Sequence, residues 1–309
     1  KEVRVRQPLT ARRVGDLLLN NALIIIMVIA VIYIAIRNPN FIKPASLINI
    51  FSQTAAYLPA ALGIGGCIVL TGTDLSAGRA VGLTACISAS LLQNAANTAN
   101  KMWPEIGTLP IPVVILLAML IGAAIGCFNG LFVAKFKLHP FIVTLGTQLI
   151  LYTCLLLYVQ QGNNNGMAIS NLDPSYTSFV KGELFRINGT PVPMYVLFAV
   201  VLTAVMWFIW NKTTFGKNMF AVGSNPEAAK VSGVNVMRTT ILVHTLAGAM
   251  YGLTGFIESS RIGSNTANTG LNYECDAIAA CVIGGVSFVG GTGKISGVVL
   301  GVFLLRIIF

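Results

Sequence analysis

The chain has 309 residues, of which 55% are hydrophobic and only 10% are charged, and its mean hydropathy is +0.78. Soluble domains carry about 25% charged residues, so this composition predicts an all-α polytopic membrane protein, with residues 1–309 forming one transmembrane domain. The net charge of +10 does not indicate nucleic-acid binding. The cations lie scattered between apolar runs, where they predict topology instead.

The apolar runs predict nine membrane crossings. They lie at roughly 17–36, 47–70, 77–94, 111–134, 141–161, 193–210, 239–258 and 275–286, with a ninth from Ile295. The chain stops within the ninth run, so a tenth helix is expected to follow it.

The charges between these runs predict an inside N-terminus. The cations before the first run, which reads as a retained helix and not as a cleaved signal peptide, are Lys1, Arg4, Arg6, Arg12 and Arg13. The segments assigned to the inside, Arg79 among them, hold more Lys and Arg than those assigned to the outside, such as the long loop 162–192.

The inner loop 211–238 contains a short helix with clear start and stop signals. Asn225 is a favoured N-cap, Pro226 suits the first helical position, and Glu227 suits the positive end of the helix dipole. Gly233 can end the helix, whose remaining residues are Ala228, Ala229, Lys230 and Val231. Such a helix is either part of a solvated connector or a docking element for a soluble partner, and the residues alone favour the connector.

Two acidic residues fall within interrupted apolar segments. Asp74 lies in GTDLSAG and Asp276 in YECDAIAACVIGG, at comparable places in the two halves of the chain. Paired interrupted segments indicate an inverted repeat with a pathway at mid-membrane, whereas the alternative makes each Asp a helix N-cap. Both roles can coexist. Glu258 and Arg261 are expected to be interfacial and exposed.

Glycines recur at every fourth position in three segments. Such small-residue faces allow helices to approach closely but say nothing about a substrate. The three sets are Gly122, Gly126 and Gly130; Gly248 and Gly252; and Gly293, Gly297 and Gly301.

The chain offers no pattern for catalysis. The run VGGTGKIS differs from a phosphate-binding loop at Phe288 and Ile295, and no strand is expected before it. We find no Ser-His-Asp or Cys-His arrangement and no CxxC pair. We therefore expect no catalytic residue, metal site or cofactor site in this chain, and any ATP and Mg²⁺ would bind a partner.

Four stretches resemble the permeases of ribose/galactose-type ABC sugar importers, with the galactose type nearest. They are GTDLSAGRAVGLTACISASLLQ (72–93), KLHPFIVTLGT (137–147), NKTTFGKNMFAVGSNPEAAKVSGVNV (211–236) and YECDAIAACVIGGVSFVGGTGKISGVVLGV (273–302). The resemblance implies a ten-helix permease of the vitamin-B12-importer type in a bacterial inner membrane. It also implies a homodimer, a cytoplasmic ATPase and a periplasmic sugar-binding protein.

The resemblance assigns roles to residues. It makes the helix in 211–238 the coupling helix that contacts the ATPase, on the match at Glu227, Ala228, Ala229 and Gly233, and so reverses the reading of this loop as a connector. The sugar pathway would be lined by Thr73, Asp74, Leu75, Ser76 and Asp276.

Other functions remain open. An ion-coupled secondary transporter would use Asp74 or Asp276 to bind H⁺ or Na⁺, and its uptake would collapse with an ionophore but survive ATP depletion. A permease of the same superfamily could carry ribose, nucleosides, autoinducers or branched-chain amino acids. A scaffold without transport activity is disfavoured by the paired acidic segments.

Overall fold

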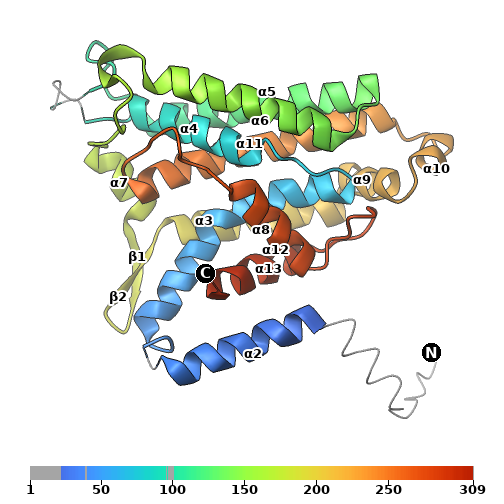
Figure 1. Cartoon of the computed structure of the whole chain (residues 1–309), viewed down its shortest axis with the longest axis horizontal. Helices are drawn as coiled ribbons and strands as arrows, with labels where there is room; N and C mark the ends of the chain where they lie inside the picture. Colours follow the sequence, from blue (N-terminus) through green and yellow to red (C-terminus); the bar gives the residue numbers. More distant parts are fainter. Residues whose placement is uncertain (1–21, 39, 95, 97–100, 309) are drawn as a thin grey trace.

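The computed structural model describes residues 22–38, 40–94, 96 and 101–308 (Figure 1). The expected inside N-terminus and the start of the first helix lie outside these residues. The elements in chain order are α2 (Ala22–Arg37), α3 (Pro44–Val69), α4 (Ala77–Leu91), α5 (Ile111–Phe136), α6 (Pro140–Val159), the 3-10 turn η2 (Gly162–Asn164), α7 (Pro174–Lys181), β1 (Glu183–Ile187), β2 (Thr190–Pro193), α8 (Tyr195–Lys212), α9 (Thr214–Ser224), α10 (Pro226–Val231), α11 (Val236–Ile262), α12 (Tyr273–Ile283) and α13 (Ile295–Ile308).

The predicted polytopic helical class is confirmed, but the crossings are less uniform than expected. Within the described ranges, five helices are long and apolar enough to span a membrane, namely α3, α5, α6, α8 and α11. The helices α4, α12 and α13 have 15, 11 and 14 residues. A span needs about 20 residues, so α4 and α12 cross only part of the apolar thickness.

Small elements gather at the two ends of the bundle (Figure 1). We name these the α7 end, which also holds the β1–β2 hairpin, and the α10 end, which also holds α9. The expected outer loop 162–192 connects α6 to α8 and contains η2, α7, β1 and most of β2. Asp173 caps α7 by accepting a hydrogen bond from the Ser175 N–H at 2.8 Å, and positive φ angles of 48° and 82° at Asn188 and Gly189 form the tight hairpin turn.

Two long helices run in opposite directions, and each leads into a short one. α3 starts against β2 and ends beside α9, whereas α11 starts after α10 and ends against α7. α4 then runs to the α7 end, where Gln93 pairs with Leu172, and α12 runs to the α10 end. This antiparallel pairing of α3–α4 with α11–α12 agrees with the predicted inverted repeat.

The two short helices meet at their N-terminal turns inside the bundle. A Cβ at Gly78 would overlap the Glu274 carboxylate and would lie 2.5 Å from the Gly270 carbonyl oxygen. Gly270 has a φ of 80°, which lets the chain turn into α12 at this contact. The two breaks in the helices thus lie next to each other although they are far apart in sequence.

The predicted glycine faces are confirmed for α5, α11 and α13. A Cβ at Gly122 would overlap the Gly248 carbonyl oxygen, and one at Gly126 would overlap that of His244. In the same way, Gly297 and Gly301 bring α13 against the carbonyls of α12. Gly293 lies in the loop before α13, where a Cβ would meet the Val69 side chain at 3.2 Å.

We expect Gly126→Leu to disrupt folding, because any side chain at this position forces α5 away from the α11 backbone. The cost should be at least about 1–3 kcal/mol, the usual range for overpacking. Gly146→Leu on α6 is the matched control, since a Cβ there has no neighbour within 4 Å. Monodisperse yield and melting temperature in detergent are the measurements, and equal values for the two variants would contradict this packing.

Candidate functional site

Asp74 lies fully buried between α3 and α4, with three hydrogen-bond donors around its carboxylate. Its Oδ1 accepts from the Ser76 backbone N–H at 3.0 Å and from the Ser76 hydroxyl at 2.6 Å, and its Oδ2 accepts from the Tyr251 hydroxyl at 3.2 Å. The described residues place no cation within ion-pair distance of it. A buried carboxylate without a basic partner is costly, which favours a functional reason for its presence.

The hydrogen bonds continue from Asp74 into a chain across the bundle. The Asn129 amide on α5 donates to the Ser76 Oγ at 2.8 Å, and the Thr147 hydroxyl on α6 donates to the Asn129 Oδ1 at 2.6 Å. We call Asp74, Ser76, Asn129, Thr147 and Tyr251 the inner polar network; all five side chains are buried. Sequence reasoning missed Asn129, Thr147 and Tyr251, whose only signal in the sequence is a polar group inside an apolar run.

A second set of bonds fixes the extended segment that carries Asp74. The Thr144 hydroxyl accepts from the Leu75 N–H at 3.1 Å. Its proton lies between the Pro140 carbonyl at 2.9 Å and the Thr73 carbonyl at 3.2 Å. Thr73 and Leu75 are half-buried. The predicted pathway residues 73–76 therefore lie inside the bundle next to α6, and their role in transport stays a prediction.

The interpretation of both acids as helix N-caps is wrong. The N-cap of α4 is Ser76, and that of α12 is Asn272 in the left-handed conformation. Asp74 accepts from the backbone two residues ahead of it and so stabilises the turn before the helix. Asp276 lies within the first turn of α12.

The structure does not bring Asp276 to Asp74. Asp276 belongs to a different cluster, where its Oδ2 accepts from the Arg306 Nη2 at 2.5 Å. The Arg306 guanidinium lies 3.5 Å from the ring centre of Tyr57, which in turn stacks on Tyr273 with ring centres 4.0 Å apart. Sequence reasoning missed Arg306 as the partner of Asp276, and it missed the two tyrosines stacked beside Arg306.

Two expectations about charged residues are corrected. Glu258 is 1% exposed, so the expectation of an exposed residue is wrong for it, whereas the Arg261 side chain keeps 29% exposure. Arg261 binds both Glu258 carboxylate oxygens, at 2.5 and 2.6 Å. Arg79 lies within the bundle and not in an inner loop. It donates to the Ala267 carbonyl at 3.1 Å and covers the ring of Tyr152 at 4.3 Å.

The predicted helix within 211–238 is confirmed as α10. The Asn225 Oδ1 accepts from the Ala228 N–H at 3.0 Å, with Pro226 and Glu227 in the first turn. Gly233 has a φ of 84°, but a Cβ there would have no neighbour within 4 Å, so its requirement is conformational and not steric. Sequence reasoning missed helix α9, and it missed that Val231 is 90% exposed.

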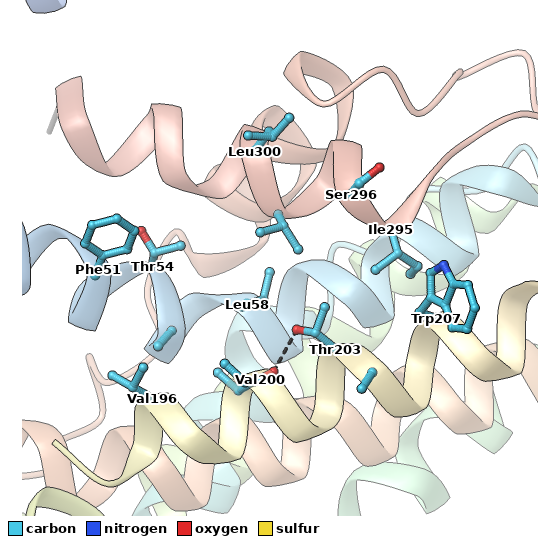
Figure 2. Close-up of a pocket in the computed structure, with 14 residues that line it drawn as sticks. Phe51, Thr54, Leu58, Val196, Val200, Thr203, Trp207, Ile295, Ser296 and Leu300 are labelled. Atoms are coloured by element: carbon cyan, nitrogen blue, oxygen red, sulfur yellow. Dashed lines mark hydrogen bonds between the residues drawn. The ribbon is translucent and has the colours of Figure 1, made fainter. Parts of the chain in front are cut away.

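A groove of ≈750 Å³ lies between α3, α8 and α13, but its chemistry does not suit a sugar (Figure 2). Its lining is apolar apart from Thr54, Thr203 and Ser296. The Thr54 and Thr203 hydroxyls are already bonded to carbonyls of their own helices, at 2.8 and 2.7 Å. The groove therefore offers almost no polar group for a solute and suits apolar contact with lipid or helix.

Long apolar helices, two facing breaks and a buried polar network together define a membrane transport protein. The chain belongs to the family described as the permease component of branched-chain amino acid transport systems, whose model matches residues 46–309.

Its relatives include sugar permeases. The chain is 45% identical over 293 residues to the galactose/methyl galactoside import permease protein MglC of Haemophilus influenzae, covering 95% of this chain and 86% of the relative. It is 46% identical to that of Escherichia coli K12, covering 92% and 83%. It is 32% identical to the ribose import permease protein RbsC of Haemophilus influenzae, covering 95% and 85%. No solved structure matches.

We expect Asp74→Asn to fold as well as the wild type or better, because it removes a buried charge while the amide can still bond Ser76 and Tyr251. Solute flux should fall by about tenfold or more if the charge serves the pathway. Melting temperature and uptake into proteoliposomes measure the two effects separately. Wild-type flux in this variant would exclude a charged role for Asp74 in transport.

Proposed function

We propose that this chain is the transmembrane subunit of an ATP-driven importer that brings a monosaccharide, galactose or a methyl galactoside, into the cytoplasm. The observation that carries the proposal is the 45% identity over 95% of the chain with a galactose/methyl galactoside permease, against 32% for a ribose permease. The subunit would act as a homodimer in a bacterial inner membrane. A cytoplasmic ATPase would bind ATP and Mg²⁺, and a periplasmic sugar-binding protein would deliver the substrate.

The geometry supports a two-state mechanism for this importer. α4 and α12 run in opposite directions from one contact at Gly78 and Glu274, so motion of one half against the other would open one end of the bundle and close the other. The inner polar network lies beside that contact and provides hydroxyl, amide and carboxylate groups. Such groups can replace water around a sugar without binding it tightly.

Uptake measurements test the proposed function directly. The complex of this chain with its ATPase, in proteoliposomes with its sugar-binding protein outside, should accumulate labelled galactose when ATP is enclosed. Accumulation should survive an ionophore and stop on ATP depletion. Accumulation of ribose but not galactose would overturn the proposed substrate, and loss with the ionophore alone would favour an ion-coupled transporter.

We propose that the α10 end lies in the cytoplasm, because four cations stand in or next to the elements there: Lys212, Lys217, Lys230 and Arg238. In a cysteine-free background, a cysteine replacing the exposed Ser175 on α7 should react with an impermeant maleimide added to whole cells. One replacing the exposed Ser224 should react only after lysis. The reverse pattern would invert the proposed orientation.

The ATPase would dock on α10, with Asn225, Pro226, Glu227, Ala228, Ala229, Lys230 and Gly233 as the coupling residues. Helix α10 has six residues and projects from the bundle (Figure 1). Val231 exposes 90% of its surface, so its burial in a groove of the partner would remove apolar surface from water. Glu227 in the first turn can face a basic rim on that partner.

We expect Glu227→Lys to weaken ATPase association by more than Glu227→Gln, because it adds like-charge repulsion at the contact. Gly233→Val should also weaken it, since a β-branched residue is strained at a φ of 84°, whereas Gly233→Asn should be milder. Glu105→Lys, on an exposed residue toward the other end, is the control. The measurements are co-purification of the ATPase and sugar-stimulated ATP hydrolysis. Wild-type association and hydrolysis in both Glu227→Lys and Gly233→Val would show that α10 is only a connector.

A further inference from the structure

Three planar side chains from different helices form one stack in the bundle. Arg306 of α13 lies 3.5 Å from the ring centre of Tyr57 on α3, and Tyr57 lies 4.0 Å from Tyr273 on α12, with an angle of 10° between the rings. Tyr57 is half-buried, so one edge of the stack reaches the surface of the chain. We call Arg306, Tyr57 and Tyr273, with Asp276, the stacked cluster.

The stacked cluster holds polar atoms that the fold leaves unused. The Arg306 Nε is buried and has no hydrogen-bond partner among the described residues. The Tyr273 hydroxyl is buried as well and lies near Glu258 and Tyr57 without a well-formed hydrogen bond to either. The Asp276 side chain, which binds Arg306, remains 31% exposed. Buried donors without partners are costly, so such atoms indicate a bond that is made only when something else is present.

A second ion pair lies close to the cluster, toward the α7 end. Glu258 and Arg261 stand in the last two turns of α11, and both act electrostatically on Tyr57 and Tyr273. Charged groups at membrane depth are costly and usually mark a solute route. The stacked cluster lies beside this pair. The pair stands toward the α7 end, which is the end at which a solute would enter in the proposed orientation.

Packing alone does not require these residue types. The same two helices also meet through Phe51, about two turns before Tyr57 on α3, and Phe303, about one turn before Arg306 on α13. Their rings stack with centres 5.0 Å apart. That apolar pair joins α3 to α13 without any charge or orphaned polar atom. The charged and polar groups of the stacked cluster are therefore not needed to join α3 to α13.

We propose that the stacked cluster is a contact site for a pyranose in the outer half of the translocation route, an assignment that rests on the proposed function. An aromatic face can cover the apolar C–H face of a sugar ring, while a guanidinium and a carboxylate bond its hydroxyls. Tyr57 provides the face, and Arg306 with Asp276 provides the donors and acceptors. In the structure the guanidinium covers the Tyr57 ring, so the site is closed until α13 moves away from α3.

The test compares Tyr57→Leu, which keeps apolar bulk but removes the ring, with Tyr57→Trp, which keeps an aromatic face. Phe51→Leu is the matched control at the neighbouring stack. Uptake of galactose and of methyl galactoside is measured with saturating sugar-binding protein, together with ATPase association and hydrolysis in the absence of sugar. Asp276→Asn is measured in the same way.

We expect Tyr57→Leu to lower sugar uptake by about tenfold and to change the ratio of the two sugars, while ATPase association and sugar-independent hydrolysis stay at wild-type values. Tyr57→Trp should retain most uptake, and Phe51→Leu should leave the ratio unchanged. Where Tyr57→Leu lowers the folded yield, a changed ratio in Asp276→Asn supports the site and an unchanged one overturns it.

The failures of the two proposals are distinguishable. If the wild-type chain moves neither sugar, the proposed function fails and the pyranose site fails with it. If the wild type moves both sugars and Tyr57→Leu and Asp276→Asn keep its rates and ratio, only the site is overturned. An equal loss in Tyr57→Leu and Phe51→Leu would also overturn it, because both stacks would then be structural.

Discussion

Direct backbone contact between α5 and α11 is the constraint on which the rest of the structure depends. Gly122 and Gly126 of α5 face Gly248 and the His244 carbonyl of α11 with no room for a side chain. Apolar side chains gain little from leaving lipid for another apolar surface, so close van der Waals contact of this kind must hold such helices together. The contact also fixes the positions of Tyr251 on α11, which donates to Asp74, and of Asn129 on α5, which donates to Ser76.

The position of the polar groups follows from the two helix breaks. A continuous helix satisfies its own backbone, but the extended segment after α3 exposes N–H and C=O groups that need partners within the bundle. Thr144 and Asp74 supply these partners at Leu75, Thr73 and Ser76. The same groups that make the break tolerable thus create the polar interior, so the structure and the proposed transport chemistry depend on one set of residues.

Local signals made parts of this fold predictable from sequence. The cap at Asn225, the proline after it and Gly233 act within a few residues, so α10 was predicted nearly to its ends. The glycine period likewise predicted the close faces, although not which helices would meet. The partners of Asp276 and the burial of Glu258 could not be predicted, because contacts such as Arg306 with Asp276 join residues 30 positions apart through the packing of three helices. Helix α9 was missed because its glycines and polar residues resemble a loop, and its helix depends on contact with α3 and α8.

A short physical connection joins the proposed docking helix to the buried carboxylate. Gly223, just before the Asn225 cap, lies against the Val69 carbonyl with no space for a Cβ, and that carbonyl accepts from the Gly291 N–H at 2.9 Å. The chain then turns at Thr71, where φ is 64°, and enters the segment that carries Asp74. Because packed backbones have little room to adjust, we expect a displacement of α9 and α10 to move the end of α3, and with it the segment that carries Asp74. We therefore expect movement at the α10 end to reach the inner polar network.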